Sequence, residues 1–191
     1  MELELLLSIA LGVGLAAACG FRIFVPFTVM SVAALGGYLD LSPTFAWIGT
    51  YPALAAFGTA TVLEILAYYI PWLDNLLDTI ATPTAVIAGT VATASVVTDM
   101  SPLLTWILAV IAGGGTAGMI QAGTALLRGT SSLTTGGLGN PVVATGELVG
   151  SIFTSVLSIV LPWLAFLLAL VFGVVLFRRL ARRRARVRQI A

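Results

Sequence analysis

Residues 5–36 read LLLSIALGVGLAAACGFRIFVPFTVMSVAALG, and this run contains a single charged residue, Arg22. About 20 apolar residues are enough to cross the hydrocarbon core of a bilayer, so the run is long enough for a membrane helix and more. Gly20 and Pro26 interrupt it on either side of the arginine. The run therefore predicts a membrane helix that is broken close to its only charge, with Gly20 and Pro26 as structural residues at the break.

The composition of the whole chain agrees with a membrane protein. Of 191 residues, 59% are apolar and 9% are charged, and the mean hydropathy is +1.09. Soluble domains carry about 25% charged residues, so we predict an all-α integral membrane protein. The sequence has no histidine and one cysteine, Cys19. This excludes disulfide frameworks, thiolate zinc sites and histidine-based catalysis within the chain, and we expect neither an enzyme nor a bound cofactor.

The charges are distributed unevenly along the chain. Seven of the nine arginines lie between Arg178 and Arg188, directly after an apolar run. This pattern indicates retention at the cytoplasmic face of a membrane rather than nucleic-acid binding. We predict one transmembrane domain, residues 1–177, followed by an Arg-rich cytoplasmic tail, residues 178–191. The first apolar segment lacks a basic leader, because Glu2 and Glu4 stand there, and we expect it to be retained.

Proline marks the predicted starts of several helices. A residue able to cap a helix precedes proline in Ser42-Pro43, Thr82-Pro83, Ser101-Pro102 and Asn140-Pro141, and proline is tolerated at the first helical position. Pro71 and Pro141 are accordingly assigned structural roles. We expect about six spans, of which the first and fourth are broken by glycines. One long kinked helix over residues 146–177 is the alternative that would give five. The spans are placed at residues 5–36, 52–70, 83–99, 102–127, 141–161 and 162–177.

Six spans predict a specific topology. With the Arg-rich tail in the cytoplasm, the N-terminus and the loop at 128–140 lie on the same side, and Asp40 and Asp99 lie outside. The two halves of the chain also resemble each other: residues 14–37 compare with 112–135, and a Pro-Trp pair follows in each half. Three-helix repeats over residues 1–100 and 101–177 would be inverted relative to one another, as in many transporters.

Two charges lie deep within the predicted spans. An ionised side chain in the membrane interior costs a few kcal/mol or more and needs a partner or water. Arg22 at a helix break is typical of an anion-binding or ion-pair site, unless the first helix ends near Gly20 and Arg22 reaches the interface. Glu64 lies six residues before the end of the second span and is the expected partner of Arg22. A structural salt bridge and a substrate site are both consistent with this pair.

Further polar residues are candidates for the same site or for a second one. Asp74 and Asp78 are four residues apart, so a helix would place both on one face. They could ligate a metal cation or belong to an amphipathic interfacial helix. Glu147 and Asn140 near the start of the fifth span are the remaining substrate-binding candidates. The alternative for Glu147 is a structural role near the interface, because the start of a helix favours a carboxylate. The Gly-, Ser- and Thr-rich stretch at 129–139 is expected to be a flexible linker or a re-entrant segment.

Three motifs resemble an uncharacterised bacterial membrane family, the domain of unknown function 4126. They are Gly-Phe-Arg-Ile-Phe-Val-Pro at 20–26, Glu64 followed by Ile-Pro-Trp-Leu-Asp at 70–74 and Asp78, and Gly-Asn-Pro-Val-Val-Ala-Thr at 139–145 with Glu147. The resemblance covers most of the chain except the Arg-rich tail. It implies a multi-span protein of the bacterial inner membrane and no established activity. The family pattern has an acidic residue shortly before the Ile-Pro, where this chain has Tyr68-Tyr69, which argues against a multi-carboxylate metal site.

The sequence thus favours a small membrane protein that moves or binds a small solute or ion at a polar site built on Arg22 and Glu64. The alternative is a non-transport scaffold or assembly factor whose charges form structural ion pairs. The expected partners are membrane lipid, an unidentified solute and, because glycine and alanine favour close helix packing, a second copy in a homodimer.

Overall fold

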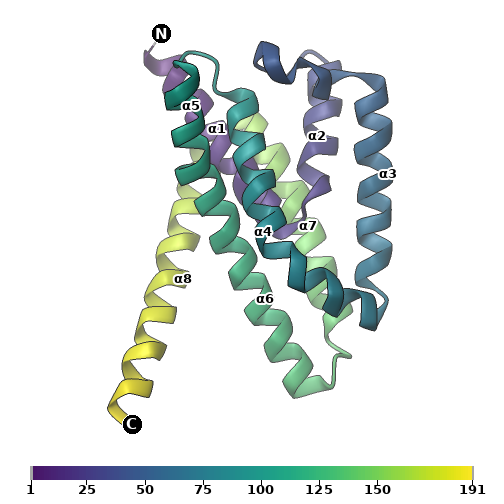
Figure 1. The fold of residues 1–191 in the computed structure, drawn as a ribbon, viewed down its shortest axis with the longest axis vertical. Helices are drawn as coiled ribbons and strands as arrows, with labels where there is room; N and C mark the ends of the chain where they lie inside the picture. Colours follow the sequence, from purple (N-terminus) through teal and green to yellow (C-terminus); the bar gives the residue numbers. More distant parts are fainter. Residues whose placement is uncertain (1, 191) are drawn as a thin grey trace.

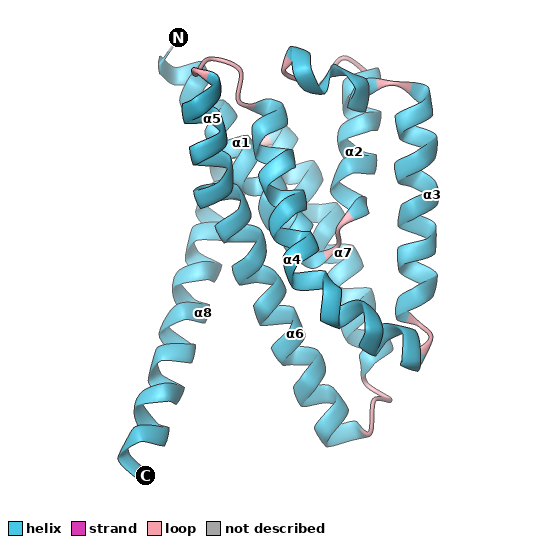
Figure 2. Ribbon diagram, viewed as in Figure 1, coloured by secondary structure: helices cyan, strands magenta, loops and turns pink. Residues whose placement is uncertain are grey.

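The computed structural model describes the backbone of residues 2–190 and all side chains in that range except those of residues 71–76, 78, 177 and 179–190. In that range the chain consists of helices joined by short connections, without strands (Figures 1 and 2). The elements are α1 (Glu2–Phe21), α2 (Phe24–Leu35), the 3₁₀ helix η1 (Pro43–Gly49), α3 (Tyr51–Tyr68), α4 (Pro71–Val96), α5 (Pro102–Leu108), the π-helix η2 (Ala109–Gly114), α6 (Gly115–Thr135), α7 (Asn140–Val160) and α8 (Pro162–Ile190).

The predicted all-α membrane class is confirmed. Five helical runs in the described part of the chain are long and apolar enough to cross a membrane, namely Glu2–Phe21, Tyr51–Tyr68, Thr79–Val96, Pro102–Thr135 and Asn140–Val160. Two shorter apolar helices, Phe24–Leu35 and Pro162–Leu176, accompany them. The chain is therefore a multi-pass α-helical membrane protein.

Helix α1 is the centre of the bundle and packs against α4, α6, α7 and α8. Its glycines permit this close packing. A Cβ added to Gly12 would lie 2.9 Å from Cγ2 of Thr93 on α4, and one added to Gly20 would lie 2.5 Å from Cβ of Ile120 on α6. The Thr93 hydroxyl also donates to the Gly12 carbonyl at 3.0 Å. Small residues let membrane helices approach until van der Waals contacts and such hydrogen bonds hold them together.

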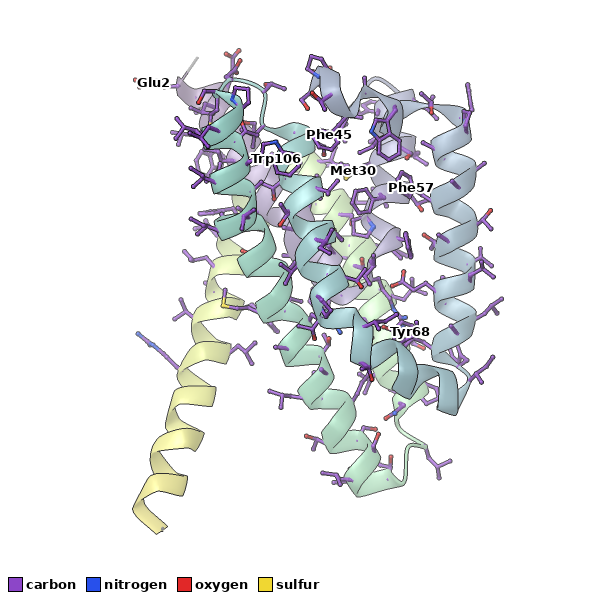
Figure 3. All side chains as sticks on the ribbon, viewed as in Figure 1. Glu2, Met30, Phe45, Phe57, Tyr68 and Trp106 are labelled. Carbon is purple, nitrogen blue, oxygen red and sulfur yellow. The ribbon has the colours of Figure 1, made fainter. Side chains whose placement is uncertain are left out.

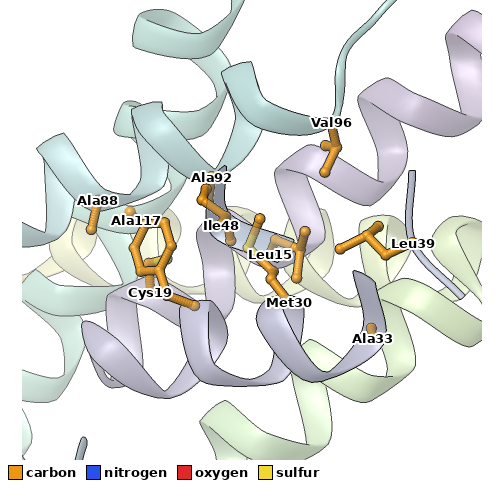
Figure 4. Packing of buried hydrophobic residues seen from close by; sticks show 11 residues of the cluster. Leu15, Cys19, Met30, Ala33, Leu39, Ile48, Ala88, Ala92, Val96 and Ala117 are labelled. Atoms are coloured by element: carbon orange, nitrogen blue, oxygen red, sulfur yellow. The ribbon is translucent and has the colours of Figure 1, made fainter. Parts of the chain in front are cut away.

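The buried apolar cluster in Figure 4 lies where α1, α2 and α4 meet. Leu15 and Cys19 of α1, Met30 of α2 and Ala92 of α4 are almost completely buried there, and Ile48 of η1 covers them. The cluster fixes α2 and η1 against the central helix. It thereby also fixes the position of the break between α1 and α2.

Helices α1 and α2 fold back on each other, and this corrects the predicted topology. In Figure 1 α1 runs inward from the N-terminal end of the molecule and α2 returns toward that end. Figure 3 shows Glu2 and Phe45 at this end and Tyr68 toward the other. The N- and C-termini consequently lie at opposite ends of the long axis, whereas the prediction placed them on the same side. The prediction was wrong because it treated residues 5–36 as one crossing.

The predicted boundary at Pro162 is confirmed. Helix α7 ends at Val160 and α8 begins at Pro162, with Leu161 at φ −136° and ψ 71° between them. The alternative of one kinked helix over residues 146–177 is therefore wrong. The residue before a proline is forced out of the helical region, which is enough to end α7 without a polar loop. Helix α8 continues into the Arg-rich tail, of which only the Arg178 side chain is described.

The fourth predicted span is loosened but not broken. Residues 102–135 form one continuous helical run with a π-helical turn over Ala109–Gly114. The run also extends through most of the predicted 129–139 linker, which is a correction. Within this stretch the hydroxyls of Thr130, Thr134 and Thr135 donate to carbonyls three or four residues earlier in the same helix. It ends where Gly136 adopts φ +63°, a conformation that favours glycine.

The proline signal located helix starts only in part. Pro102 and Pro141 do lie in the first turns of α5 and α7, as Pro71 does in α4. Pro83, however, lies inside α4. The structure also does not confirm the inverted three-helix repeat. Helix α1 and the run that starts with α5 begin at the same end of the molecule in Figure 1, whereas inverted repeats would begin at opposite ends.

Candidate functional site

The break between α1 and α2 brings Arg22 and Glu64 into the interior of the bundle. Helix α1 ends at Phe21, and the Arg22 N–H still donates to the Ala18 carbonyl at 3.1 Å. Helix α2 starts at Phe24, with Pro26 in its first turn, where a missing N–H leaves no hydrogen bond unmade. The close contact of Gly20 with α6 fixes the end of α1. Arg22 therefore extends from a rigid position.

Glu64 caps α2 from another helix. Its carboxylate, on α3, accepts hydrogen bonds from the N–H of Ile23 at 2.8 Å and from the N–H of Phe24 at 3.1 Å. The first N–H groups of a helix have no partner within it and carry partial positive charge. Ile23 supplies no side-chain cap of its own. The carboxylate thus satisfies two donors that the helix break would leave unpaired inside the membrane.

The Arg22 guanidinium is buried and only partly hydrogen-bonded. Its Nη2 donates to the Ala144 carbonyl on α7 at 2.8 Å and lies 3.6 Å from Oε2 of Glu147. Its Cζ lies 3.9 Å from the centroid of the Tyr68 ring. The other two nitrogens, Nε and Nη1, are buried and have no hydrogen-bond partner among the described side chains and backbone. Arg22 thus places a positive charge in the interior, and the edge of its guanidinium formed by Nε and Nη1 donates no hydrogen bond to the described residues.

Arg128 and Glu147 form a two-point ion pair. The Arg128 Nε donates to Oε1 of Glu147 at 3.0 Å, and its Nη2 donates to Oε2. This two-point contact matches the planar fork of the guanidinium to the carboxylate. It joins α6 to α7 close to their connecting turn. Glu147 therefore links both arginines, one closely and one at longer range.

Tyr68 lies between the elements that carry these charges. Its ring centroid is 3.9 Å from Cζ of Arg22 and 3.9 Å from Cζ of Arg128. A guanidinium at this distance from an aromatic face is attracted by the ring quadrupole, more strongly when water is excluded. We name these five residues the Arg–Glu cluster. Its members and their exposed fractions are Arg22 2%, Glu64 9%, Tyr68 5%, Arg128 2% and Glu147 4%.

With this geometry established, comparison with known proteins places the chain in a family. Residues 9–182 match the family described as domain of unknown function 4126. The chain belongs to this family. No curated protein and no solved structure matches it. The family description carries no activity, so any function of this member of the 4126 family has to be inferred from its own residues.

One charged residue from each of the three motifs singled out in the sequence lies in the Arg–Glu cluster. Arg22 of the first motif, Glu64 of the second and Glu147 of the third all lie in the Arg–Glu cluster. The partners differ from those predicted, however. Arg22 forms its ion pair with Glu147, while the carboxylate of Glu64 accepts hydrogen bonds from backbone donors. Arg22 also does not reach the membrane interface, because its side chain is almost fully buried in the bundle.

The remaining predicted residues lie elsewhere or outside the described side chains. Asn140 is the first residue of α7, and its Nδ2 donates to the Ser132 hydroxyl at 3.1 Å, which ties α7 to the end of α6. Asp74 and Asp78, the predicted metal ligands, lie outside the described side chains. Among the side chains that are described, no group of three or more His, Cys, Asp or Glu residues could hold a metal.

Sequence reasoning missed two members of the Arg–Glu cluster, Tyr68 and Arg128. Arg128 precedes a Gly-, Ser- and Thr-rich stretch and was assigned to a cytoplasmic loop. Tyr68 was noted only as a departure from the pattern of the 4126 family. A helical signal for Tyr68 was available, because Thr61, Glu64 and Tyr68 follow a three- and four-residue spacing and so share one face of α3. For Arg128, only the extension of α6 to Thr135 reveals its burial.

Proposed function

We propose that this protein binds and moves a small solute across the membrane, and that the Arg–Glu cluster forms its polar site. The solute would carry hydrogen-bond acceptors, as small anions do. The observation that supports this is the free donor edge of Arg22. Buried N–H donors are nearly always hydrogen-bonded. Arg22, at a helix break inside a membrane domain, presents two buried nitrogens that have no partner in the part of the chain that the structure describes.

Helix breaks within membrane proteins support the same proposal. Discontinuous helices often carry substrate sites in transporters, because their ends present unpaired backbone groups and partial charges to the interior. Here Glu64 occupies the backbone donors at the start of α2, and the guanidinium of the preceding residue, Arg22, contacts Ala144 and Glu147 on α7. A small anion bound at Arg22 would therefore meet guanidinium donors on a rigid support.

The setting of the proposed transporter follows from the charge pattern. We propose that the chain resides in a bacterial inner membrane with the Arg-rich tail in the cytoplasm, as the positive-inside rule favours. The connection between α6 and α7 lies at the same end as the C-terminus in Figure 1 and would then also be cytoplasmic. We assign no enzymatic activity and expect a homodimer as the functional unit.

The test uses purified protein with sodium chloride, nitrate, acetate and phosphate as probes. We expect at least one of these anions to raise the melting temperature of the wild type in detergent and to be taken up by proteoliposomes. Arg22→Lys keeps the positive charge but removes Nε–H and the planar fork. It should remain folded and lose both the thermal shift and the uptake.

Tyr69→Phe is the matched control. It removes a hydroxyl that is hydrogen-bonded to the Thr145 hydroxyl at 2.8 Å, beside the Arg–Glu cluster, and it leaves Arg22 unchanged. This variant should bind and transport like the wild type. Wild-type protein that neither moves nor is stabilised by any of the four anions would contradict the proposal. So would Arg22→Lys protein with full uptake.

A structural scaffold is the second candidate, because most charges in the cluster are already used. Arg128 pairs with Glu147 through two hydrogen bonds, and Glu64 caps α2. Under this alternative, Arg22→Lys and Arg22→Ala would both unfold the protein. None of the four anions would then stabilise the wild type or be taken up by it.

A further inference from the structure

A second feature, separate from the Arg–Glu cluster, is an apolar groove beside α8. Figure 1 shows α8 diverging from α6 toward its C-terminal end. Between α8, α1 and the η2–α6 run lies a cavity of about 520 Å³. Thr116 and Arg178 are the only residues with polar side chains in its lining. The rest of the lining is apolar and includes Met119, Leu170, Gly173 and Val174.

The α8 side of this groove is one helical face that ends in a charge. Leu170, Val174 and Arg178 follow one another at four-residue intervals, so they stand in a row along the helix. Gly173 leaves space beside this row, because a Cβ added there would lie 3.5 Å from Met119 Cε, which is an ordinary contact distance. Arg178 is exposed and is the first of the seven arginines of the tail. The groove therefore has an apolar body and a cationic end.

We propose that this groove binds one anionic phospholipid, with an acyl chain along α8 and the headgroup phosphate at Arg178. The groove residues on α8 run from Phe166 to Arg178, which corresponds to about 18 Å of helix. That length is close to one leaflet, which is half of a hydrocarbon core about 30 Å thick. Basic residues at the membrane boundary of a helix attract anionic headgroups. The lipid would come from the leaflet on the side of the C-terminal tail.

A neighbouring cavity provides an internal comparison. It has a volume of about 380 Å³, lies between α8, α7 and α1, and shares Ala169 with the first groove. Its lining includes Phe21, Phe153 and Phe172 and no charged residue. This cavity could accept an acyl chain but offers nothing to a phosphate. Headgroup selectivity is therefore expected at the Arg178 groove alone of the two.

The experiment measures lipid retention by native mass spectrometry. Detergent-purified, full-length protein is mixed with phosphatidylglycerol or phosphatidylcholine that have identical acyl chains. The wild type should bind the first phosphatidylglycerol about tenfold more tightly than phosphatidylcholine, which corresponds to one charge-assisted hydrogen bond. Arg178→Gln should abolish this preference. Arg186→Gln, which removes the same charge two turns further along the tail, should keep it.

A second pair of variants tests the groove itself. Gly173→Phe places a ring in the groove and should reduce binding of both lipids severalfold, whereas Gly173→Ala should bind like the wild type. An equal loss of preference in Arg178→Gln and Arg186→Gln would reduce the effect to general attraction by the tail and overturn the proposal. Lipid binding by Gly173→Phe at the wild-type level would also overturn the proposal. A change of Gly173→Phe from dimer to monomer would do so too, because the groove would then hold a second copy of the chain rather than a lipid. The two arginine variants change only charges at the end of the chain, so their comparison remains decisive even if Gly173→Phe fails to fold.

Discussion

The stability of the helix break should depend on the carboxylate of Glu64 in a graded way. Three substitutions on the buried face of α3 remove different parts of its contact with α2. Thr61→Val removes a hydroxyl that lies 2.8 Å from the Thr28 hydroxyl. Glu64→Gln keeps one acceptor oxygen but loses the charge and the second acceptor. Glu64→Leu removes both acceptors from the N–H groups at the start of α2.

The magnitudes follow from the groups left unpaired. Thr28 also donates to the Phe24 carbonyl at 3.1 Å, so Thr61→Val should lower the free energy of unfolding by only about 1 kcal/mol. Glu64→Gln leaves one buried N–H without an acceptor and removes a charge from a helix N-terminus, which together cost about 2–4 kcal/mol. Glu64→Leu leaves two such donors unpaired and should cost about 4–6 kcal/mol.

Cys19 supplies the assay. It is the only cysteine and is completely buried against α2, so a fluorogenic maleimide should label it only after unfolding. Labelling during a denaturant titration in detergent micelles gives the free energy of unfolding for each variant. The reasoning would be refuted if Glu64→Gln were no more destabilising than Thr61→Val. The Glu64 carboxylate would then contribute nothing to the start of α2 beyond what a neutral hydroxyl pair contributes.

Three further predictions concern the packing, the turn and the topology. Gly20→Ala should cost about 1–3 kcal/mol, because its Cβ would lie 2.6 Å from the Ala117 carbonyl. A Cβ added to Gly146 would meet no other atom, so Gly146→Ala should leave the stability unchanged or raise it by up to about 1 kcal/mol. Equal changes in the free energy of unfolding for Gly20→Ala and Gly146→Ala in the Cys19 assay would contradict this prediction. Gly136→Ala should cost about 1–2 kcal/mol for its φ of +63°, whereas Gly129→Ala in the helix should not, as the same titration would report. Epitope tags at the two termini should be cleaved by protease from opposite faces of sealed vesicles, and cleavage of both from one face would contradict the fold.

The membrane class and most helix ends could be predicted because they depend on local properties. Chain-wide hydropathy decides which solvent the surface meets, and proline restricts the backbone wherever it stands. The helix boundary at Pro162 and the helix break near Arg22 could both be predicted because proline restricts the backbone locally. Pro83 is the exception, since a proline can stand inside a membrane helix when its neighbours maintain the helix.

The direction of α2 could not be predicted because it is set by a distant residue. The backbone at Ile23 has φ −74° and ψ −49°, values close to those of a helix, so nothing local distinguishes a kink from a reversal. The contact with Glu64, some 40 residues further on, holds the start of α2. Reading residues 5–36 as one crossing then placed the N-terminus at the wrong end.

Arg128 was missed for a related reason. Glycine, serine and threonine are typical of loops because their side chains or freedom compete with helical hydrogen bonds. In α6 the threonine hydroxyls bond within the helix instead, so the helix continues past Arg128 and the arginine is buried. The proximity of Arg22 and Glu64 was expected from their depth in the predicted spans, whereas the position of Glu147 between the two arginines required the structure.

The structure divides the charges of the Arg–Glu cluster into two kinds. Glu64 and the Arg128–Glu147 pair each satisfy groups that the fold would otherwise leave unpaired in a medium without water, so their removal should act first on stability. Arg22 differs, because it donates one hydrogen bond to the Ala144 carbonyl, and its other two buried nitrogens have no partner among the described residues. A residue retained only for stability would be expected to use its donors or to be replaced by a smaller one, since each unpaired donor costs about 1–3 kcal/mol. Arg22 is therefore the position at which a variant should separate solute binding from folding.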